Sequence, residues 1–488
     1  MLKKYIFGYL LLCGVLLNAG GVVVLSAGVY KLYQSGISID TVVFKVANIV
    51  DKRVPFIATK MRSIVQITDP EYILDGTSLD NSVGGVGVRF PYVKPNENTN
   101  QGHGRSIQVD SAVEFRKALR NAKPGDIITL AKGVYRFDSK SISIGKKGSI
   151  DKPIRVRADR LGDVTIQLNT IEGFYVNQPY WEFENLKIDG VCKSDSRCEH
   201  AFHVVGNGHH FVLKNSIVTD FNAAIKVNGT KVKGRRVYPD FGRIEFNNIY
   251  NHSVRDTSNA VTPIDVVAAN NWIVRKNVIA DFVKGKGNTI SYGGFFKGAG
   301  TDNMFEQNLV ACRYKLNRHS GVQVGLSFGG GGSSQASCRG GSCKAEHYRG
   351  TIRNNIIVNC NDVAVYINKS PETEIYNNTL INTLGIDIRY SQSSAVIANN
   401  ILTGRIKNRN GGSSEDYANF VFDINDLTDY FSVLSKGDMS LVDGSEILLK
   451  GIPTIKDEFD FCNTRKMAGA IDIGAIQYSA NGGVCKLF

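Results

Sequence analysis

Eight asparagines recur in this chain inside nearly the same short phrase. An apolar residue precedes each Asn by three or four positions, and another follows it within one or two. The phrases are centred on Asn185, Asn215, Asn248, Asn277, Asn308, Asn355, Asn378 and Asn400. A short phrase at a loosely fixed period is typical of a solenoid. Because the phrases are short, rich in β-branched residues and bounded by Gly, Asn and Asp, each repeat is predicted to consist of strands.

These features predict a parallel β-helix with one coil per repeat. Stacked coils place equivalent residues about 4.8 Å apart, so the amides of one Asn column can donate to and accept from one another. Asn also tolerates the left-handed backbone of a tight bend. The alternative is that each Asn is only a turn residue. In either case we expect these residues to be structural and not part of a functional site.

A second strand follows each phrase and is predicted to display one common outer face. Strand alternation in AIKVNG and PIDVVA points every second side chain outward. The side chains expected on this face are His203, Lys226, Asn228, Asp265, Lys297, Asn368, Asp387 and Arg389. Inserts at 229–243 and 329–350 should flank the face, where solenoids gather their binding loops.

The charge balance favours an anionic partner. The 488 residues carry a net charge of +13, which suits an acidic polysaccharide, a nucleic acid or a membrane surface. The sequence contains no nucleic-acid-binding motif, and its basic residues are not gathered in one run. We therefore predict an acidic polysaccharide as the partner of a monomeric protein that does not bind nucleic acid.

The N-terminus predicts a membrane anchor. Lys3 and Lys4 precede an uncharged apolar stretch from Tyr5 to Tyr30, which is long enough to span a bilayer. Their charge would keep the N-terminus inside and place the solenoid on the periplasmic or extracellular side. Cleavage near Ala19, giving a secreted protein, is the alternative. The predicted domains are an anchor at 1–30, a short helix and linker at 31–105, the β-helix at 106–478 and a tail at 479–488.

The cysteine count predicts disulfides. Nine cysteines become eight once Cys13, in the predicted anchor, is set aside, and an even number in an exported chain is typical of disulfide bonds. Two pairs close in sequence, Cys192 with Cys198 and Cys338 with Cys343, could each close a loop. The sequence leaves the pairing of the others open: Cys312, Cys360, Cys462 and Cys485. No C-x-x-C pattern indicates a zinc site.

Residues 112–137 resemble the opening of a known family. AVEFRKALRNAKPGDIITLAKGVYRF, followed by KPIRVRA, resembles the start of the right-handed β-helix polysaccharide lyases, of the chondroitinase B and related alginate lyase type. Ala470–Ala475 is similar to the closing motif of exported β-helix proteins. Over residues 106–405 the resemblance implies an all-β, single-stranded right-handed parallel β-helix. The helical spacing of Val113, Phe115, Ala118 and Leu119 predicts a helix that caps the first coil.

The resemblance implies β-elimination from a uronic acid. A base removes the proton beside the carboxylate, and a cation neutralises that carboxylate. In the family the base is a Lys on an outward strand position upstream of an N-x-Φ phrase, which here corresponds to Lys297. The family's Arg on the next coil has no counterpart in QVGLSFGGGG, so the candidate substitutes are Arg313, Arg318 and His319 in the preceding loop. The family's calcium site would retain Asp265 alone.

Alternatives remain for each candidate residue. His203 is either an acid/base or an ordinary strand residue, and Lys226 and Asn228 either bind a sugar carboxylate or lie in solvent. Asp265 and Lys297 are either a catalytic pair or a structural ion pair. The corresponding functions are a polysaccharide lyase or uronate epimerase, a non-catalytic polysaccharide-binding protein and, last, a glycoside hydrolase, which needs two facing carboxylates.

Overall fold

The computed structural model describes residues 104–138, 140–316, 321–330, 332–453, 459–466 and 471–478, with Val43, Ile57, Gly469 and Cys485 as single residues. Contacts divide the chain into two compact units, Met1–Val65 and Gln66–Phe488. The predicted anchor at 1–30, and nearly all of the helix and linker predicted for 31–105, lie outside the described residues. Within the described part, no helix is both long and apolar enough to cross a membrane.

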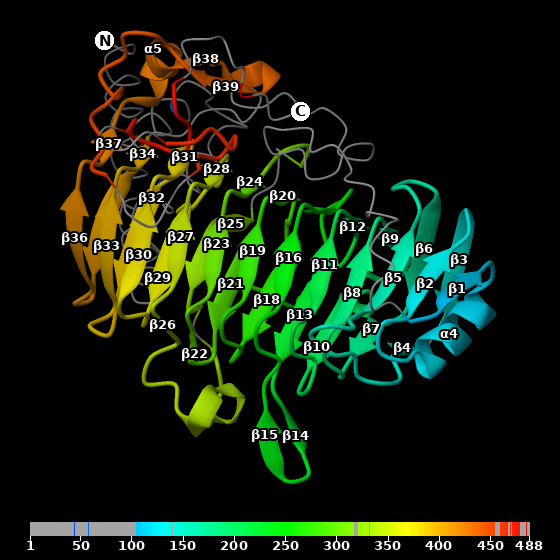
Figure 1. Ribbon diagram of the computed structural model, residues 1–488. Helices are drawn as coiled ribbons and strands as arrows, with labels where there is room; N and C mark the ends of the chain where they lie inside the picture. The colour runs from blue at the N-terminus through cyan, green and yellow to red at the C-terminus, as the bar shows by residue number, and fades with distance from the viewer. Residues whose placement is uncertain are drawn as a thin grey trace, which may run out of the picture. The chain divides into compact units, whose positions relative to one another are not determined.

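The second unit is a stack of coils in which strands from three parallel sheets follow one another (Figure 1). Sheet A comprises β1 (Ser106–Val109), β2 (Ile127–Leu130), β5 (Ile154–Ala158), β8 (Trp181–Glu184), β11 (Val212–Lys214), β16 (Arg243–Glu245), β19 (Ile273–Arg275), β23 (Met304–Glu306), β27 (Thr351–Arg353), β30 (Thr373–Tyr376), β33 (Ser394–Ala398) and β36 (Ser413–Tyr417). Sheet B comprises β3 (Gly133–Asp138), β6 (Val164–Asn169), β9 (Lys187–Gly190), β12 (Ile217–Thr219), β17 (Asn248–Tyr250), β20 (Val278–Ala280), β24 (Leu309–Ala311), β28 (Ile356–Val358), β31 (Thr379–Ile381), β34 (Ile401–Leu402) and β37 (Phe420–Val421).

Sheet C completes each coil. It comprises β4 (Ile142–Ser143), β7 (Glu172–Val176), β10 (His200–Val205), β13 (Ile225–Asn228), β18 (Ile264–Val267), β21 (Ile290–Lys297), β25 (Val322–Phe328), β29 (Val365–Asn368), β32 (Gly385–Arg389) and β35 (Arg405–Arg409). Inward side chains of the three sheets form one continuous apolar core. The prediction of a parallel β-helix is confirmed, and the arrangement is consistent with the right-handed form.

Shorter elements lie in the connections between these strands. They are β14 (Thr230–Val232), β15 (Arg235–Val237), β22 (Gly300–Thr301), β26 (His347–Tyr348), β38 (Phe431–Val433), β39 (Asp438–Leu441), η2 (Asp195–Arg197), η3 (Gln335–Ser337), η4 (Arg339–Gly341), η5 (Ile424–Asp426), α5 (Leu427–Tyr430) and η6 (Leu434–Lys436). Strands β14 and β15 form an antiparallel hairpin that projects from the coils (Figure 1).

Helix α4 (Ala112–Asn121) packs on the first coil, as predicted. Its N-cap Ser111 accepts a hydrogen bond from the Glu114 backbone N–H at 3.3 Å, which satisfies one of the free donors of the first turn. Phe115 and Leu119 are fully buried and belong to the core. Val113, expected on the apolar side, is exposed instead. The helix therefore closes the apolar end that an uncapped solenoid would leave open to water.

An asparagine ladder runs through the turns between sheets A and B. Its members are Asn247, Asn277, Asn308, Asn355, Asn378, Asn400 and Asn419. Each side-chain N–H donates to the Oδ1 of the next member at 2.9–3.0 Å. Each Oδ1 from Asn277 onward also accepts from the backbone N–H of the preceding member. The ladder thus satisfies buried polar groups along the stack.

Five of the eight predicted positions belong to this column, and Asn185 and Asn215 form a coil-to-coil pair of their own, in which the Asn215 side-chain N–H donates to Asn185 Oδ1 at 2.6 Å. Asn185 and Asn215 stand one position earlier, at φ 59° and 49°, and Asn248 is the first residue of β17. The turn has two positions, a left-handed residue and then the ladder residue, so the ladder Asn is not itself the left-handed residue. Lys276 (φ 55°) precedes Asn277 in this way. At Asn247 and Asn248 the adjacent asparagines made the two positions indistinguishable in the sequence.

The outer face of sheet B is covered by the C-terminal part of the chain. Its strands read VIA, LVA and IIV and are buried on both faces, as continuous apolar runs require. Their outer side chains pack with Phe431, Met439, Phe461 and Ile473 in a second apolar cluster. Residues 411–461 were expected to wrap or cap the last coils. They supply the last strands β36 and β37 and then lie along sheet B, so the outer face of this sheet is closed to a ligand from β12 onward, whereas the outward side chains of β3 are exposed.

The outer face of sheet A carries an alternating column of charges. Consecutive partners in the register are Glu184, Lys214, Glu245, Arg275, Glu306 and Arg353. Lys214 lies 3.0 Å from Glu184, and Arg275 lies 2.8 Å from Glu245. These charges neutralise one another within the column, so it offers no surplus charge to a partner.

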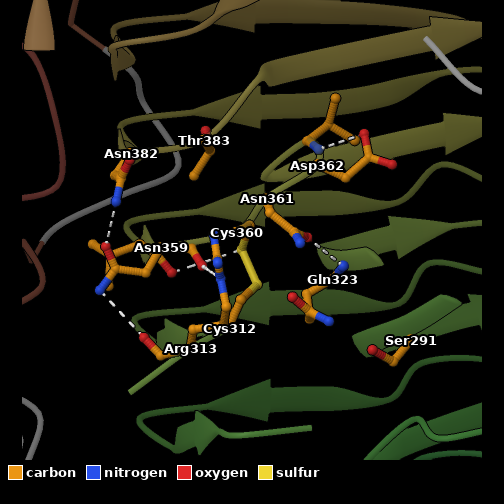
Figure 2. The surroundings of a disulfide bond; sticks show 12 residues. Ser291, Cys312, Arg313, Gln323, Asn359, Cys360, Asn361, Asp362, Asn382 and Thr383 are labelled. Atoms are coloured by element: carbon orange, nitrogen blue, oxygen red, sulfur yellow. Dashed lines mark hydrogen bonds between the residues drawn. A yellow bond between two sulfur atoms is a disulfide. The ribbon is translucent and has the colours of Figure 1, made fainter. Parts of the chain in front are cut away.

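Four disulfides join all eight cysteines outside the predicted anchor: Cys192–Cys198, Cys312–Cys360, Cys338–Cys343 and Cys462–Cys485. Two of these confirm the predicted local pairs. Cys312 and Cys360 follow the paired strands β24 and β28, and both are fully buried. Figure 2 shows this bond near Asn361, whose Oδ1 accepts a hydrogen bond from the Gln323 backbone at 2.7 Å.

Removing the Cys312–Cys360 bond is expected to destabilise the fold more than removing Cys192–Cys198. The first joins residues 48 apart and the second residues 6 apart. Chain entropy then predicts losses of about 4 and about 2 kcal/mol on replacement of each pair by Ser. Urea denaturation of the two double variants measures both losses. Equal losses would contradict this loop-length account.

Candidate functional site

Sheet C carries the predicted outer face, named here the Lys297 face. Its register aligns one row of outward residues: Tyr175, His203, Lys226, Asp265, Phe295, Ser327, Tyr366, Asp387 and Lys407. A second outward row lies two residues further along each strand. In this row Val205 pairs with Asn228, Val267 pairs with Lys297, and Asn368 pairs with Arg389. The structure therefore places all eight described candidate residues on one face, and their roles stay predictions.

Long connections on both edges of sheet C mark the middle of this face. Between sheets B and C the connections 251–263, 281–289 and 312–321 are long, whereas 382–384 and 403–404 are short. Between sheets C and A lie the inserts that follow β13 and β25. These two inserts contact each other, since Tyr238 Oη donates to the Cys338 carbonyl oxygen at 3.3 Å and the Arg339 guanidinium lies over the Tyr238 ring. Functional residues commonly lie where such loops gather on a rigid scaffold.

Lys226 and Asp265 form an ion pair in the centre of the face. Lys226 Nζ donates to Asp265 Oδ2 at 2.7 Å. Asp265 is buried, and its second oxygen, Oδ1, has no hydrogen-bond partner within the described part of the protein. A buried carboxylate oxygen without a donor costs free energy unless a ligand or water donates to it.

Lys297 lies on the coil after Asp265 and is the least engaged cation of this cluster. Among the described residues its ammonium forms no hydrogen bond or ion pair, and Nζ lies 4.2 Å from the centre of the Phe295 ring. Burial lowers the pKa of Lys297 below its usual value, and the nearby Lys226 charge lowers it further, whereas Asp265 and Glu346 oppose the shift. A lysine with a lowered pKa has a larger neutral fraction, which is the form that accepts a proton.

His203 is held between two neighbours on the same face. Its Nδ1 lies 2.9 Å from Glu172 Oε1, and its Nε2 lies 2.8 Å from Asn228 Oδ1. Both ring nitrogens are therefore engaged within the protein. This arrangement fits a positioning residue better than a free acid or base. The Asn228 amide also donates to the Gly229 carbonyl oxygen at 3.1 Å.

A second cluster lies two and three coils beyond Lys297. Tyr366 Oη accepts from the Asn368 amide at 3.0 Å and from the Arg389 guanidinium at 3.2 Å. Asn368 Oδ1 is buried without a partner within the described residues. Asp387 accepts two hydrogen bonds from Arg409 Nε, at 2.9 and 3.0 Å. Arg409 thus neutralises Asp387, while Arg389 is buried and bound to Tyr366.

The expected second cation near Lys297 is not found on the next coil. Strand β25 places Ser327 beside Phe295, and its hydroxyl donates to the Tyr366 carbonyl oxygen at 2.8 Å. Two of the predicted substitutes, Arg318 and His319, lie outside the described residues. Arg313, in the same connection, is buried, and its guanidinium donates to the Asn359 carbonyl oxygen at 3.4 Å.

The residues around Asp265 do not fit a calcium site. Calcium takes six to eight oxygen ligands, several of them carboxylates. Asp265 is bound by the Lys226 ammonium, and no group of three or more His, Cys, Asp or Glu in the described part could hold a metal ion. We therefore derive no step through calcium.

Sequence reasoning missed three residues around Lys297 and His203. Phe295 lies two positions before Lys297, so strict alternation in GFFKGAG could have found it. Glu172 pairs with β10 across one coil. Glu346 belongs to the 329–350 insert, where its Oε2 accepts from Ser333 Oγ at 2.8 Å. Because no periodicity extends into an insert, no sequence signal could have placed Glu346.

Comparison with known proteins establishes the fold and no family. A family model described as periplasmic copper-binding protein (NosD) matches residues 331–418, which is less than half of the chain. No curated protein matches. Pectate lyase Pel9A superposes with a TM-score of 0.52 at 14% identity, covering 78% of this chain and 98% of that chain. The protein is thus a parallel β-helix protein with the fold of a polysaccharide lyase.

Two further structures are more distant. An alginate lyase from Paenibacillus sp. str. FPU-7 gives a TM-score of 0.37 at 14% identity, covering 64% of this chain and 99% of that chain. A rhamnogalacturonan lyase gives 0.43 at 11% identity, covering 72% and 95%. A shared fold does not fix function, so the chemistry must be argued from the side chains on the Lys297 face.

Proposed function

We propose that this protein acts on an acidic polysaccharide by β-elimination, with Lys297 as the base. The observation that carries this proposal is the Lys297 ammonium, half-buried over Phe295, unpaired among the described residues and with a lowered pKa. It lies on the outer face of sheet C, whereas sheet B is covered from β12 onward and sheet A carries a column of paired charges.

In the proposed reaction the neutral Lys297 amine takes the proton from the ring carbon that bears the carboxylate. The electron pair left on that carbon forms a double bond to the neighbouring carbon as the bond from that neighbour to the glycosidic oxygen breaks. The departing oxygen is protonated by the Lys297 ammonium or by water. Lys226 retains two N–H donors beyond the one used by Asp265 and can bind the substrate carboxylate.

The remaining residues of the Lys297 face would bind the polymer. Asn368 and Arg389, which both donate to Tyr366 Oη, would line the path of the polymer about 10 to 14 Å along the stack from Lys297, at about 4.8 Å per coil. His203 lies on the coil before Lys226 and positions Asn228, which shares strand β13 with Lys226 and would bind a hydroxyl through its amide. The polymer would run along the stack, across the strands of sheet C.

The proposal includes export and anchoring. The apolar stretch at 5–30 would hold the chain in a membrane as a monomer, with the β-helix on the periplasmic or extracellular side. Four disulfides support an oxidising compartment. Cysteine alkylation of intact cells without reductant is a test, and labelling of the Cys338–Cys343 pair would contradict export.

The proposed reaction is tested by incubating the full chain with alginate, pectate and glycosaminoglycans. Elimination creates an unsaturated uronate, which is followed by its ultraviolet absorbance. Uronate epimerisation shares the first proton abstraction, so it would exchange that hydrogen with deuterated water without forming the unsaturated product. If none of these polymers gives either the unsaturated product or hydrogen exchange, the catalytic proposal is overturned.

The rate is expected to rise with pH through the lowered pKa of Lys297. The ammonium form cannot accept a proton, so kcat/KM should fall at pH values below this pKa and level off above it. Because burial lowers the pKa, the rising limb should lie below the pKa of an ordinary lysine, which is about 10.4. A pH profile of initial rates measures this limb. A limb centred at the ordinary lysine value would contradict a buried base.

Non-catalytic binding of an acidic polysaccharide is the second candidate function. It is favoured by the absence of an Arg on β25, since elimination needs strong neutralisation of the carboxylate. A glycoside hydrolase is disfavoured. Asp265 and Asp387 lie four strands apart, about 19 Å, and each is bound by a cation. Hydrolysis requires two carboxyl groups within about 10 Å.

A further inference from the structure

A pocket of about 320 Å³ lies on the outer face of sheet A, away from the Lys297 face. Its floor is formed by outward side chains that are consecutive partners in the register: Glu182, Val212, Arg243 and Ile273. The pocket therefore runs along the stack across four strands, a span of about 14 Å at about 4.8 Å per strand. Such a span suits a segment of a linear polymer.

One wall of the pocket is an aromatic stack. The His210 ring lies 4.5 Å from the Tyr180 ring and 5.1 Å from the Phe241 ring, with interplanar angles of 6° and 8°. All three residues have left-handed backbones, with φ 60° at Tyr180, 55° at His210 and 64° at Phe241, which is uncommon for bulky side chains. The next coil has Asn271 at the same position (φ 57°), so the stack ends at Phe241, whose ring is 48% exposed.

Arg243 is an unpaired cation in this pocket. Its neighbours in the register are Val212 and Ile273, and it forms no hydrogen bond or ion pair among the described residues. In the adjacent column of the same sheet, Lys214 and Arg275 each pair with a carboxylate. Glu182, the acid of the pocket, is already bound by Arg155 at 2.9 Å. An exposed guanidinium without a carboxylate partner, beside a column of paired charges, points to an anionic ligand.

The other titratable groups that line the pocket do not compete for the anion. Burial lowers the pKa of His210, and the neighbouring His209 and Arg243 lower it further, which favours the neutral ring. Arg243 is thus the cation of the pocket lining. The pocket combines an open aromatic ring, one guanidinium and the Asn271 amide.

We propose that this pocket binds a uronate residue of an acidic oligosaccharide at a second, non-catalytic site. A pyranose ring presents an apolar C–H face. This face would pack on the exposed Phe241 ring, in the space beside Asn271 where the aromatic stack ends. Its carboxylate would accept hydrogen bonds from Arg243, and a hydroxyl would bind the Asn271 amide. This site lies on a different sheet from Lys297 and does not require Lys297 to be catalytic.

The two tryptophans of the chain provide a reporter for this pocket. Trp181 directly follows Tyr180, and Trp272 directly follows Asn271. Both are buried, and the Trp272 ring packs so closely on Gly242, between Phe241 and Arg243, that a Cβ there would lie 2.4 Å from it. The full chain carrying Lys297→Met, which prevents cleavage, would be titrated with oligogalacturonate and alginate oligomers and followed by tryptophan fluorescence and calorimetry.

The expected result is saturable binding of an acidic oligomer that depends on the pocket. Arg243→Met keeps the apolar stem and should raise the Kd about tenfold or more, because a hydrogen bond to a charged group contributes about 1.5–3 kcal/mol. Phe241→Asn, which suits the left-handed backbone as Asn271 does, should also raise it. Arg120→Met on the exposed side of α4 is the matched control and should bind as the parent does.

Three results would overturn the proposal. One is the absence of both heat and fluorescence change with every uronate oligomer. Another is an unchanged Kd in Arg243→Met, which would assign any binding to another face. The third is equal or tighter binding of an uncharged cello-oligosaccharide or of single-stranded DNA, which would exclude a site for acidic sugars.

Discussion

Replacement of Lys297 by Met is expected to lower the rate of unsaturated product formation at least about a hundredfold. Positioned proton transfer contributes about 10²–10⁴-fold to a rate, and Met preserves the stem over Phe295 without the amine. The variant should fold normally, since the Lys297 ammonium makes no hydrogen bond or ion pair in the described part of the chain. Initial rates on the best polymer of the panel provide the measurement.

The control for this experiment is Lys117→Met on the exposed side of helix α4, which removes the same charge far along the stack. It should leave the rate unchanged. If Lys297→Met retains the parent rate, Lys297 has no part in the chemistry. If Lys297→Met loses turnover but still binds the polymer, the residue acts in catalysis and not in substrate binding.

Replacement of Asn308 by Ala is expected to lower the free energy of unfolding by about 4 kcal/mol. The Asn308 side chain accepts from the Asn277 backbone and amide at 3.1 and 3.0 Å and donates to Val274 O and Asn355 Oδ1 at 2.8 and 2.9 Å. Ala would leave several of these buried groups unsatisfied, at about 1–3 kcal/mol each. Urea denaturation of parent and variant measures the loss.

Asn408→Ala provides the comparison for the ladder. Asn408 lies on β35, is exposed and, among the residues that the structure describes, donates only to Ser414 Oγ, at 3.0 Å. Its replacement should change the free energy of unfolding by less than about 0.5 kcal/mol. Similar losses at Asn308 and Asn408 would show that the ladder hydrogen bonds do not contribute to stability beyond an ordinary surface contact.

The fold could be predicted from sequence because its dominant interactions repeat. Each coil must bury apolar strand residues and satisfy the buried turn, so the apolar–Asn–apolar phrase recurs wherever a coil does. The same alternation correctly assigned Lys226, Asp265 and Lys297 to one face. It could not separate adjacent asparagines at the turn, and Asn248 was therefore assigned to the ladder in place of Asn247.

The surroundings of the candidate base could be predicted only in part. Phe295 obeys the strand alternation, but Glu346 enters from an insert whose path no periodicity describes. The Cys312–Cys360 pair was also undecidable, because its two residues lie 48 positions apart and become neighbours only when the coils stack. The calcium ligands implied by the resemblance do not gather around Asp265, where a lysine ammonium takes their place.

The charge column on sheet A has a consequence for how faithfully the coils assemble. Neighbouring coils carry opposite charges at this position, so coils two apart carry the same charge. A chain that skipped one coil would bring Glu184 beside Glu245, or Lys214 beside Arg275, and like charges directly opposite are destabilising. The inward positions of the same strands are apolar in every coil, so their polarity does not mark which coil is which. The charge column therefore favours pairing of each coil with the adjacent coil over pairing with the coil two positions away. The apolar–Asn–apolar phrase, which is the same in both, cannot make this distinction.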